Sequence, residues 1–168
     1  KQLLDIKAVK LSPENPFTWA SGWKSPIYCD NRKVLSYPAA RKVVYNAFVD
    51  IIKKNFKDVD VIAGVATGAI AVGMMVAEVL DKPFVYVRPK PKDHGTGAQV
   101  EGDLAPGARV VVVEDLISTG GSSLSAVGAL EKSGAIVLGM VAIFTYNFIK
   151  SIRAFENANV ELHTLSHY

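Results

Sequence analysis

Residues 110–123, VVVVEDLISTGGSS, contain the clearest structural signal in this chain. The four consecutive valines are β-branched and lack polar alternation, which is typical of a strand buried on both faces of a parallel sheet. We expect this strand to span 109–114 and to run directly into two carboxylates, Glu114 and Asp115. A turn rich in hydroxyl groups and glycine follows and opens a helix near Ser122. The segment therefore predicts a strand–turn–helix unit with polar chemistry at its turn.

Apolar runs alternate with helix-like stretches on both sides of this unit. Further strands are expected at 59–65, 84–88, 137–144 and 160–165, and helices at 39–54, 69–80, 122–133 and 148–158. This alternation predicts an α/β fold, with a mainly parallel twisted sheet flanked by helices and ligands at the carboxyl ends of the strands. Residues 1–37 do not fit it and are expected to form a small N-terminal hood, with a helix followed by irregular or short-stranded chain. Residues 38–168 are expected to form the α/β core of a single domain, in which 89–106 form a flexible loop without regular structure.

Composition excludes several classes of protein. The 168 residues fit one domain, and 19 Lys and Arg against 16 Asp and Glu give a net charge of +3. That charge is too small for a nucleic-acid-binding stripe but suits a local site for a small anion. The single cysteine, Cys29, favours a reducing compartment, so a cytoplasmic protein is expected, and no apolar run approaches the ~20 residues of a membrane helix. The missing initial Met and the abrupt C-terminus lead us to expect a trimmed form of a slightly longer protein.

The turn after the acidic pair has the residues of a phosphate site. Gly120 and Gly121 allow several backbone N–H groups to point into one concavity, and the following helix adds its positive dipole end. Four hydroxyl groups can donate as well: Ser118, Thr119, Ser122 and Ser123. Because two carboxylates would repel a phosphate, they indicate a second partner, either a sugar diol or a metal ion. The alternative is a simple N-cap turn, in which Ser122 or Ser123 caps the helix and both acids are solvated.

A hydrophobic strand, an acidic pair, two residues and then Ser-Thr-Gly-Gly resembles the binding motif for 5-phosphoribosyl 1-pyrophosphate (PRPP) in type I phosphoribosyltransferases, which have a Rossmann-like fold. The resemblance implies that Glu114 and Asp115 hold the ribose hydroxyls and stabilise the cation that develops on the ring. It implies that PRPP is bound by a continuous run of residues: Glu114, Asp115, Leu116, Ile117, Ser118, Thr119, Gly120, Gly121 and Ser122. A second turn, GVATGA at 64–69, resembles the pyrophosphate loop of the family, with Ala66, Thr67 and Gly68 as its binding residues. A close-packed turn between a strand and a helix is the alternative there.

Residues 88–95, RPKPKDHG, place Arg88, Lys90, Lys92 and His94 at alternate positions, which share one face of an extended chain. The two intervening prolines block a helix, and the glycines that follow can act as hinges, as in a lid over a polyanion. A solvated charged loop is the alternative. The pattern resembles the catalytic loop of orotate phosphoribosyltransferases, which implies that Arg88, Lys92 and His94 are catalytic and contact pyrophosphate, often in the neighbouring subunit of a homodimer. Many members have Lys directly after the Arg, where this chain has Pro89 and where Lys90 is the available substitute.

Residues 17–32, FTWASGWKSPIYCDNR, form a turn-rich aromatic segment, which by itself predicts only a hydrophobic edge of the hood. The segment is similar to the Phe-x-x-x-Ser-Gly-x-x-Ser-Pro-x-Tyr signature of orotate phosphoribosyltransferases, where it covers the pyrimidine. The resemblance implies that Tyr28, the backbone of Cys29 and Ser118 bind orotate. The arginine that some relatives use for the orotate carboxylate has no obvious counterpart in this chain.

Four motifs in this order imply an orotate phosphoribosyltransferase, a pentosyltransferase that makes orotidine 5′-monophosphate and pyrophosphate from PRPP and orotate in pyrimidine (UMP) biosynthesis. The resemblance also implies Mg²⁺, held mainly through PRPP and water rather than by direct protein ligands, and a homodimer. Neither nucleic acid nor a membrane is expected as a partner. The alternatives are a purine phosphoribosyltransferase, against which the hood sequence argues, a PRPP-sensing regulator that binds nucleic acid, and a nucleotide-binding module without turnover.

Overall fold

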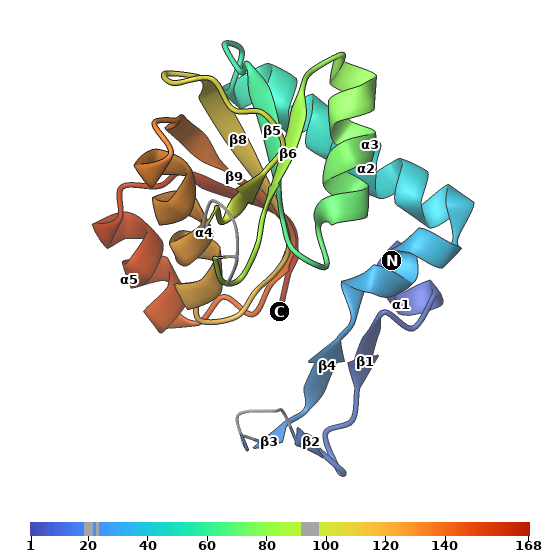
Figure 1. The fold of residues 1–168 in the computed structure, drawn as a ribbon. Coiled ribbons are helices and arrows are strands. Elements are labelled where there is room, and N and C mark those ends of the chain that lie inside the picture. The colour runs from blue at the N-terminus through green and yellow to red at the C-terminus, as the bar shows by residue number, and fades with distance from the viewer. Residues whose placement is uncertain (19–21, 23, 92–97) are drawn as a thin grey trace.

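A computed structural model describes residues 1–18, 22, 24–91 and 98–168 of the chain (Figure 1). Its centre is a six-stranded sheet with the spatial order β10-β9-β8-β5-β6-β7. The strands span β5 Val61–Val65, β6 Phe84–Val87, β7 Val100–Glu101, β8 Arg109–Ile117, β9 Ile136–Thr145 and β10 Leu162–His167. The strands pair in parallel from β10 to β6, and β7 at the edge is antiparallel to β6. The predicted α/β fold with a mainly parallel sheet is confirmed.

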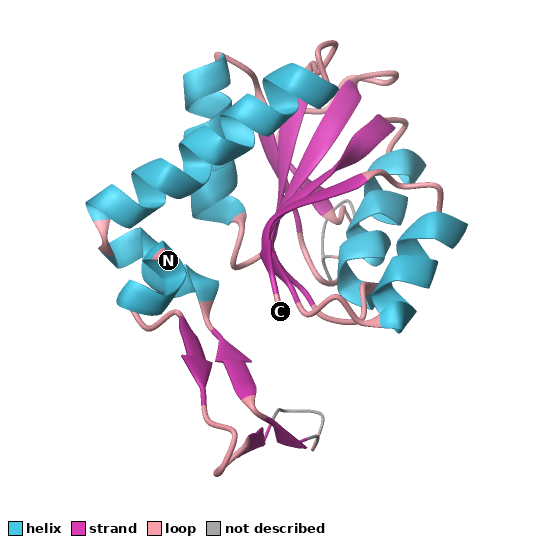
Figure 2. Ribbon diagram, turned by 180° about the vertical axis from the view of Figure 1, so that it is seen from behind, coloured by secondary structure: helices cyan, strands magenta, loops and turns pink. Residues whose placement is uncertain are grey.

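Helices cover both faces of this sheet (Figures 1 and 2). On one face α2 (Pro38–Asn55) and α3 (Ile70–Leu80) pack in a core that includes Val111 and Val113 of β8. On the other face α4 (Gly121–Lys132) and α5 (Ile149–Asn157) pack in a core that includes Val110 and Val112. All four valines have no exposed surface, so alternate residues of one strand supply two separate cores. This arrangement explains why their sequence shows no alternation with polar residues.

The N-terminal hood, residues 1–37, extends away from the sheet (Figure 1). It contains α1 (Gln2–Asp5), the short strands β1 (Val9–Leu11), β2 (Phe17–Thr18), β3 (Lys24–Ser25) and β4 (Ile27–Cys29), and the 3₁₀ helix η1 (Asn31–Ser36). β1 pairs antiparallel with β4, and β2 with β3. A third small core joins Val9, Ile27 and Cys29 of the hood to Phe144 and Tyr146. Because those two aromatic residues lie at the carboxyl end of β9, the base of the hood is held at the ligand-binding edge of the sheet.

Two expectations about local structure are wrong. The strand predicted at 109–114 continues to Ile117, so the acidic pair lies inside β8 rather than after it. The segment 89–106, expected to lack regular structure, contains β7, a two-residue strand paired with Tyr86 and Val87 of β6. Among the described residues, no helix combines the length and the apolar character needed to cross a membrane.

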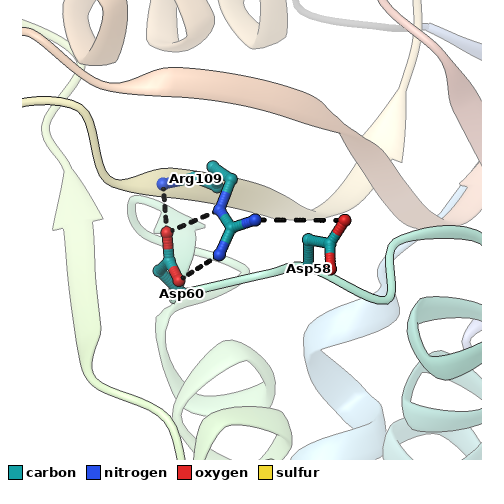
Figure 3. A network of polar contacts seen from close by, with 3 residues as sticks. All are labelled: Asp58, Asp60 and Arg109. Atoms are coloured by element: carbon teal, nitrogen blue, oxygen red, sulfur yellow. Dashed lines mark hydrogen bonds and ion pairs between the residues drawn. The ribbon is translucent and has the colours of Figure 1, made fainter.

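An ion-pair network holds the starts of the two central strands together (Figure 3). The backbone N–H and the Nε of Arg109 both donate to Asp60 Oδ2 at 2.9 Å, and Nη2 donates to Oδ1 at 2.9 Å. The Arg109 Nη1 lies 3.9 Å from Asp58 Oδ2. Hydrogen bonds from the guanidinium and the backbone of Arg109 lower the pKa of Asp60 to about 2. The network therefore fixes the amino ends of β5 and β8 and leaves their carboxyl ends for chemistry.

Candidate active site

The two predicted turns meet at the point where the strand order of the sheet reverses. After β5 the chain crosses through α3 to β6 on one side, whereas β8 lies on the other side of β5 and leads to β9. In an open parallel sheet this reversal leaves a crevice outside the carboxyl ends of the two strands. A cleft of about 590 Å³ lies there. It is lined by Cys29, Asp30, Arg32, Val65, Ala66, Thr67, Gly68, Val87, Arg88, Pro89, Gln99, Glu114, Asp115, Leu116, Ser118, Thr119, Gly120, Ser122, Ser125 and Ala126.

The amino end of α4 opens into this cleft through the turn 118–122. Gly120 is the N-cap of α4 with φ +87°, in the left-handed region, and a Cβ atom there would lie 3.1 Å from the ring of Phe155. None of the described side chains caps this helix end. The Ser123 hydroxyl instead donates to Glu114 Oε2 at 2.8 Å, so the alternative of an N-cap serine at 122 or 123 is wrong. The first N–H groups of α4 are therefore available to an anion, as the sequence predicted.

The two acids differ in environment. Glu114 is 5% exposed and accepts hydrogen bonds from the Ser123 hydroxyl and, at 2.9 Å, from the Asp115 backbone N–H. Burial and the neighbouring carboxyl of Asp115 raise the pKa of Glu114 to about 8, which favours its protonated form. Asp115 is half-buried and lines the cleft. The alternative of two solvated acids is wrong, and Asp115 is left as the carboxylate of the pair that can meet a ligand.

The turn after β5 packs directly against Asp115. A Cβ atom on Gly68 would overlap Oδ2 of Asp115, so only glycine permits this contact. The peptide bond between Ala66 and Thr67 is cis, and the Ala66 N–H donates to the Val87 carbonyl at 2.9 Å. Gly64 fits the close-packed alternative, because a Cβ there would lie 2.8 Å from the Ala69 carbonyl oxygen. The turn thus has a packed start at Gly64 and an open part, 66–68, that lines the cleft beside Asp115.

The hood contributes a second wall. Of its described residues, Cys29, Asp30 and Arg32 line the cleft, and Tyr28 does not. Tyr28 is 40% exposed and its ring lies 5.7 Å from that of Phe17, centroid to centroid. Burial, with the negative charges of Asp115 and Asp30 as further causes, raises the pKa of the Cys29 thiol to about 12. The thiol of Cys29 therefore lines the wall and reacts only slowly, and the orotate roles of Tyr28, Cys29 and Ser118 stay predictions.

Arg88 stands at the end of β6 where the basic loop begins. Its N–H donates to the Gln99 carbonyl at 2.8 Å, and its own carbonyl accepts from Gln99 Nε2 at 2.9 Å, which closes the base of the loop. Its Nη1 atom is 3.8 Å from Glu101 Oε1, too far for a hydrogen bond, and is buried without a hydrogen-bond partner among the described residues. Lys92 and His94, the other predicted catalytic residues of this loop, lie outside the described residues. Gln99 was not predicted, since a glutamine in a charged loop carries no signal of its own.

The cleft fits a magnesium ion that keeps most of its own water. Carboxylates of Asp115 and Asp30 line it, and carboxylate oxygens are ligands that Mg²⁺ prefers. Among residues 1–18, 22, 24–91 and 98–168, no group of three or more His, Cys, Asp or Glu could hold a metal ion. This donor set suits an ion bound through substrate phosphates and water rather than by a protein cage.

Comparisons with known proteins identify the family of this chain. A model of the phosphoribosyl transferase domain matches residues 31–154. Orotate phosphoribosyltransferases of Phocaeicola vulgatus and Bacteroides thetaiotaomicron are 61% and 60% identical over 168 residues, which is all of this chain and 79% of each relative. The crystal structure of orotate phosphoribosyltransferase from Aeropyrum pernix superposes with a TM-score of 0.86 at 31% identity, covering 98% of this chain and 90% of that one. The fold is thus that of a phosphoribosyl transferase domain. Within that class, the chain belongs to the orotate phosphoribosyltransferase family.

Substituting Glu114→Gln is expected to remove a pH-dependent penalty on folding. A carboxyl with an ordinary pKa of 4.5 that rises to about 8 in the folded chain favours folding while protonated, and this contribution is lost as the pH rises through about 8. Glutamine does not ionise, so the variant does not lose this contribution. The Tm of the variant minus the Tm of wild type should therefore increase as the pH rises from 5 to 8. A change of several degrees is expected, since ~1 kcal/mol corresponds to about 2–4 °C at this chain length. Thermal unfolding followed by circular dichroism from pH 5 to pH 8 measures it.

The exposed Glu131→Gln, in the last turn of α4, is the control and should show no such trend. Parallel Tm curves for wild type and Glu114→Gln across this pH range would contradict the buried, protonated state of Glu114.

Proposed function

We propose that this chain transfers the 5-phosphoribosyl group from PRPP to orotate, which yields orotidine 5′-monophosphate and pyrophosphate for pyrimidine biosynthesis. One observation carries the proposal. An uncapped helix end, a carboxylate, a glycine turn and the hood converge on one cleft of about 590 Å³. Each matches one part of the two substrates, namely phosphate, ribose, pyrophosphate and base.

The phosphate of PRPP is bound at the amino end of α4. The N–H groups of this helix end, together with the hydroxyls of Thr119 and Ser122 in the cleft wall, donate to the 5-phosphate. Glu114 stabilises the start of α4 by accepting a hydrogen bond from the Ser123 hydroxyl. The raised pKa of Glu114 favours its neutral form, which reduces its repulsion of the phosphate.

The ribose lies next to Asp115, which accepts hydrogen bonds from its hydroxyls. In the reaction the C1–O bond to pyrophosphate breaks, positive charge develops on the ring, and a nitrogen of orotate forms the new bond to C1. The Asp115 carboxylate stabilises that positive charge. The charge of orotate is on its carboxylate, so the proton of the reacting ring nitrogen leaves to water or to an oxygen of the departing pyrophosphate as the new bond forms.

Pyrophosphate is bound between the turn 66–68 and the basic loop. Arg88 lines this part of the cleft, and its buried Nη1 is an N–H donor for which pyrophosphate oxygen is a suitable acceptor. By resemblance to the family, Lys92 and His94 add positive charge to the leaving group. Asp115 would help to hold a Mg²⁺ ion in this cleft, and the ion would supply neutralisation of the pyrophosphate charge.

The hood covers orotate on the remaining side. Cys29 lines the cleft, and its backbone, Tyr28 and Ser118 are the proposed base-binding groups. We further infer that two chains form a homodimer in which the loop 89–106 reaches the neighbouring site, as the family pattern of this loop implies. A cytoplasmic location accords with the single, unpaired cysteine.

Ultraviolet absorbance of orotate tests the proposed reaction. Absorbance should fall when the protein, PRPP and Mg²⁺ are mixed with orotate. Chelation with EDTA should slow the reaction roughly 100-fold or more, because a metal supplies several kcal/mol of charge stabilisation, and added Mg²⁺ should restore it. Parallel assays with adenine and hypoxanthine should show no product. A folded protein that leaves orotate unchanged, or that prefers a purine, would contradict the proposed function.

Substituting Gly68→Ala is expected to damage the site while the fold is kept. The added methyl group overlaps the Asp115 carboxylate and must displace it, and a misplacement of ~1 Å can cost about 10²-fold in rate. We expect kcat/KM for PRPP to fall about 10-fold to 100-fold. Gly128→Ala on the exposed side of α4 is the matched control, because a Cβ there meets no atom within 4 Å. Equal activity of the two variants would show that the contact between Gly68 and Asp115 has no part in the reaction.

A further inference from the structure

A buried asparagine, Asn31, links the hood to the acidic end of β8. We propose that Asn31 is a positioning residue that fixes the base-binding hood relative to the ribose-binding Asp115. The inference rests on the proposed function of this cleft. Neither the motif at 110–123 nor the hood signature includes this residue.

Both polar groups of the Asn31 side-chain amide form hydrogen bonds. Asn31 is 3% exposed, and its Nδ2 donates to the Asp115 carbonyl at 2.6 Å, across 84 residues of sequence. Its Oδ1 accepts from the Cys29 Sγ at 3.1 Å. An amide is planar and carries a donor and an acceptor at a fixed separation, so one side chain sets the positions of both partners.

The partners of Asn31 are the cleft residues whose relative position matters most. Cys29 lines the wall of the hood, and Asp115 lies beside Gly68 in the pyrophosphate turn. The pairing of β5 with β8 ends at Gly64 and Val113, so Asp115 lies two residues beyond the last partner from β5. Asn31 thus contacts β8 beyond the end of its pairing with β5, while its pairing with β9 continues to Ile117.

This link controls alignment of the two substrates more than the affinity for either one. Orotate and PRPP each keep their own contacts if the hood shifts, but the nitrogen of orotate and C1 of the ribose are no longer in line. Misalignment of about 1 Å can cost about 10²-fold in rate. The expected signature is a fall in kcat of about 10-fold to 100-fold with the KM of either substrate changed less than about 3-fold.

Two variants separate the contacts of Asn31. Asn31→Ala removes both hydrogen bonds. Asn31→Asp keeps an acceptor for the Cys29 thiol but loses the N–H donor to Asp115. It also places a carboxylate next to the backbone carbonyl of Asp115. Both should lose kcat to a similar extent, since the contact with Asp115 is the one that aligns the substrates.

Val59→Ala is the matched control for lost stability. Val59 is 5% exposed and belongs to the core beneath α2 and α3, just before β5 and thus at the end of the sheet away from the cleft. Assays are run well below the Tm of each variant. The positioning role is wrong if kcat falls no more in Asn31→Ala than in Val59→Ala. It is also wrong if the main effect of Asn31→Ala is a higher KM rather than a lower kcat. If wild type shows no turnover of orotate, the proposed function itself fails.

A measurement that needs no turnover tests the same link. Cys29 is the only cysteine in the chain, so its reaction rate with the thiol reagent DTNB reports on the hood alone. In the proposed site PRPP binds at Asp115, so saturating PRPP should slow the reaction of Cys29 in wild type through the link made by Asn31. In the Asn31→Ala variant PRPP should no longer slow it. Calorimetry checks that this variant still binds PRPP. An equal effect of PRPP in both proteins would mean that PRPP merely covers Cys29, and would overturn the proposal. A thiol rate in wild type that PRPP does not change would overturn it as well.

Discussion

Burial of both faces of β8 is the constraint on which the rest of the structure depends. Val110 and Val112 enter one core while Val111 and Val113 enter the other, so helices must cover the sheet on both sides. Crossovers through helices make the strands parallel, and parallel strands bring their carboxyl ends to one edge. At that edge the end of β5 and the end of β8 are neighbours, although Val65 and Ile117 are 52 positions apart along the chain. The turn after β5 and the turn after β8 both line the cleft, so the cleft depends on their meeting at this edge.

The charge balance of the cleft follows from where each acid is buried. Two ionised carboxylates beside an anion site would weaken phosphate binding, which made the pair difficult to explain from sequence. Glu114 reduces this conflict because burial favours its protonated form and its oxygens accept hydrogen bonds from the Ser123 hydroxyl and the Asp115 N–H. The same hydrogen bond draws Ser123 away from the end of α4, which stays uncapped for a ligand. One buried glutamate therefore reduces the negative charge and also supports the turn that binds the anion.

The sequence predicted the sheet, the two turns and their order, because valine runs and glycine turns are local signals. The end of β8 was predicted three residues early, since polar Glu114 and Asp115 resemble a strand end, although the ladder with β9 continues through Leu116 and Ile117. The strand β7 was missed because two residues carry no periodicity. Asn31 was missed because its partner lies 84 residues away, and the burial of Glu114 because it results from packing. Local chemistry was thus predictable, whereas contacts made by the tertiary fold were not.

Backbone hydrogen exchange with and without PRPP tests most directly whether the ends of β5 and β8 form one ligand site. If they do, PRPP should slow exchange in 66–68 and in 118–122 together, over the same range of PRPP concentration. Amides near Asp58 and Asp60, at the opposite end of the sheet, should be unaffected and serve as an internal reference. Protection of only one turn, or protection of the two at clearly different PRPP concentrations, would contradict a single site built at the reversal of strand order.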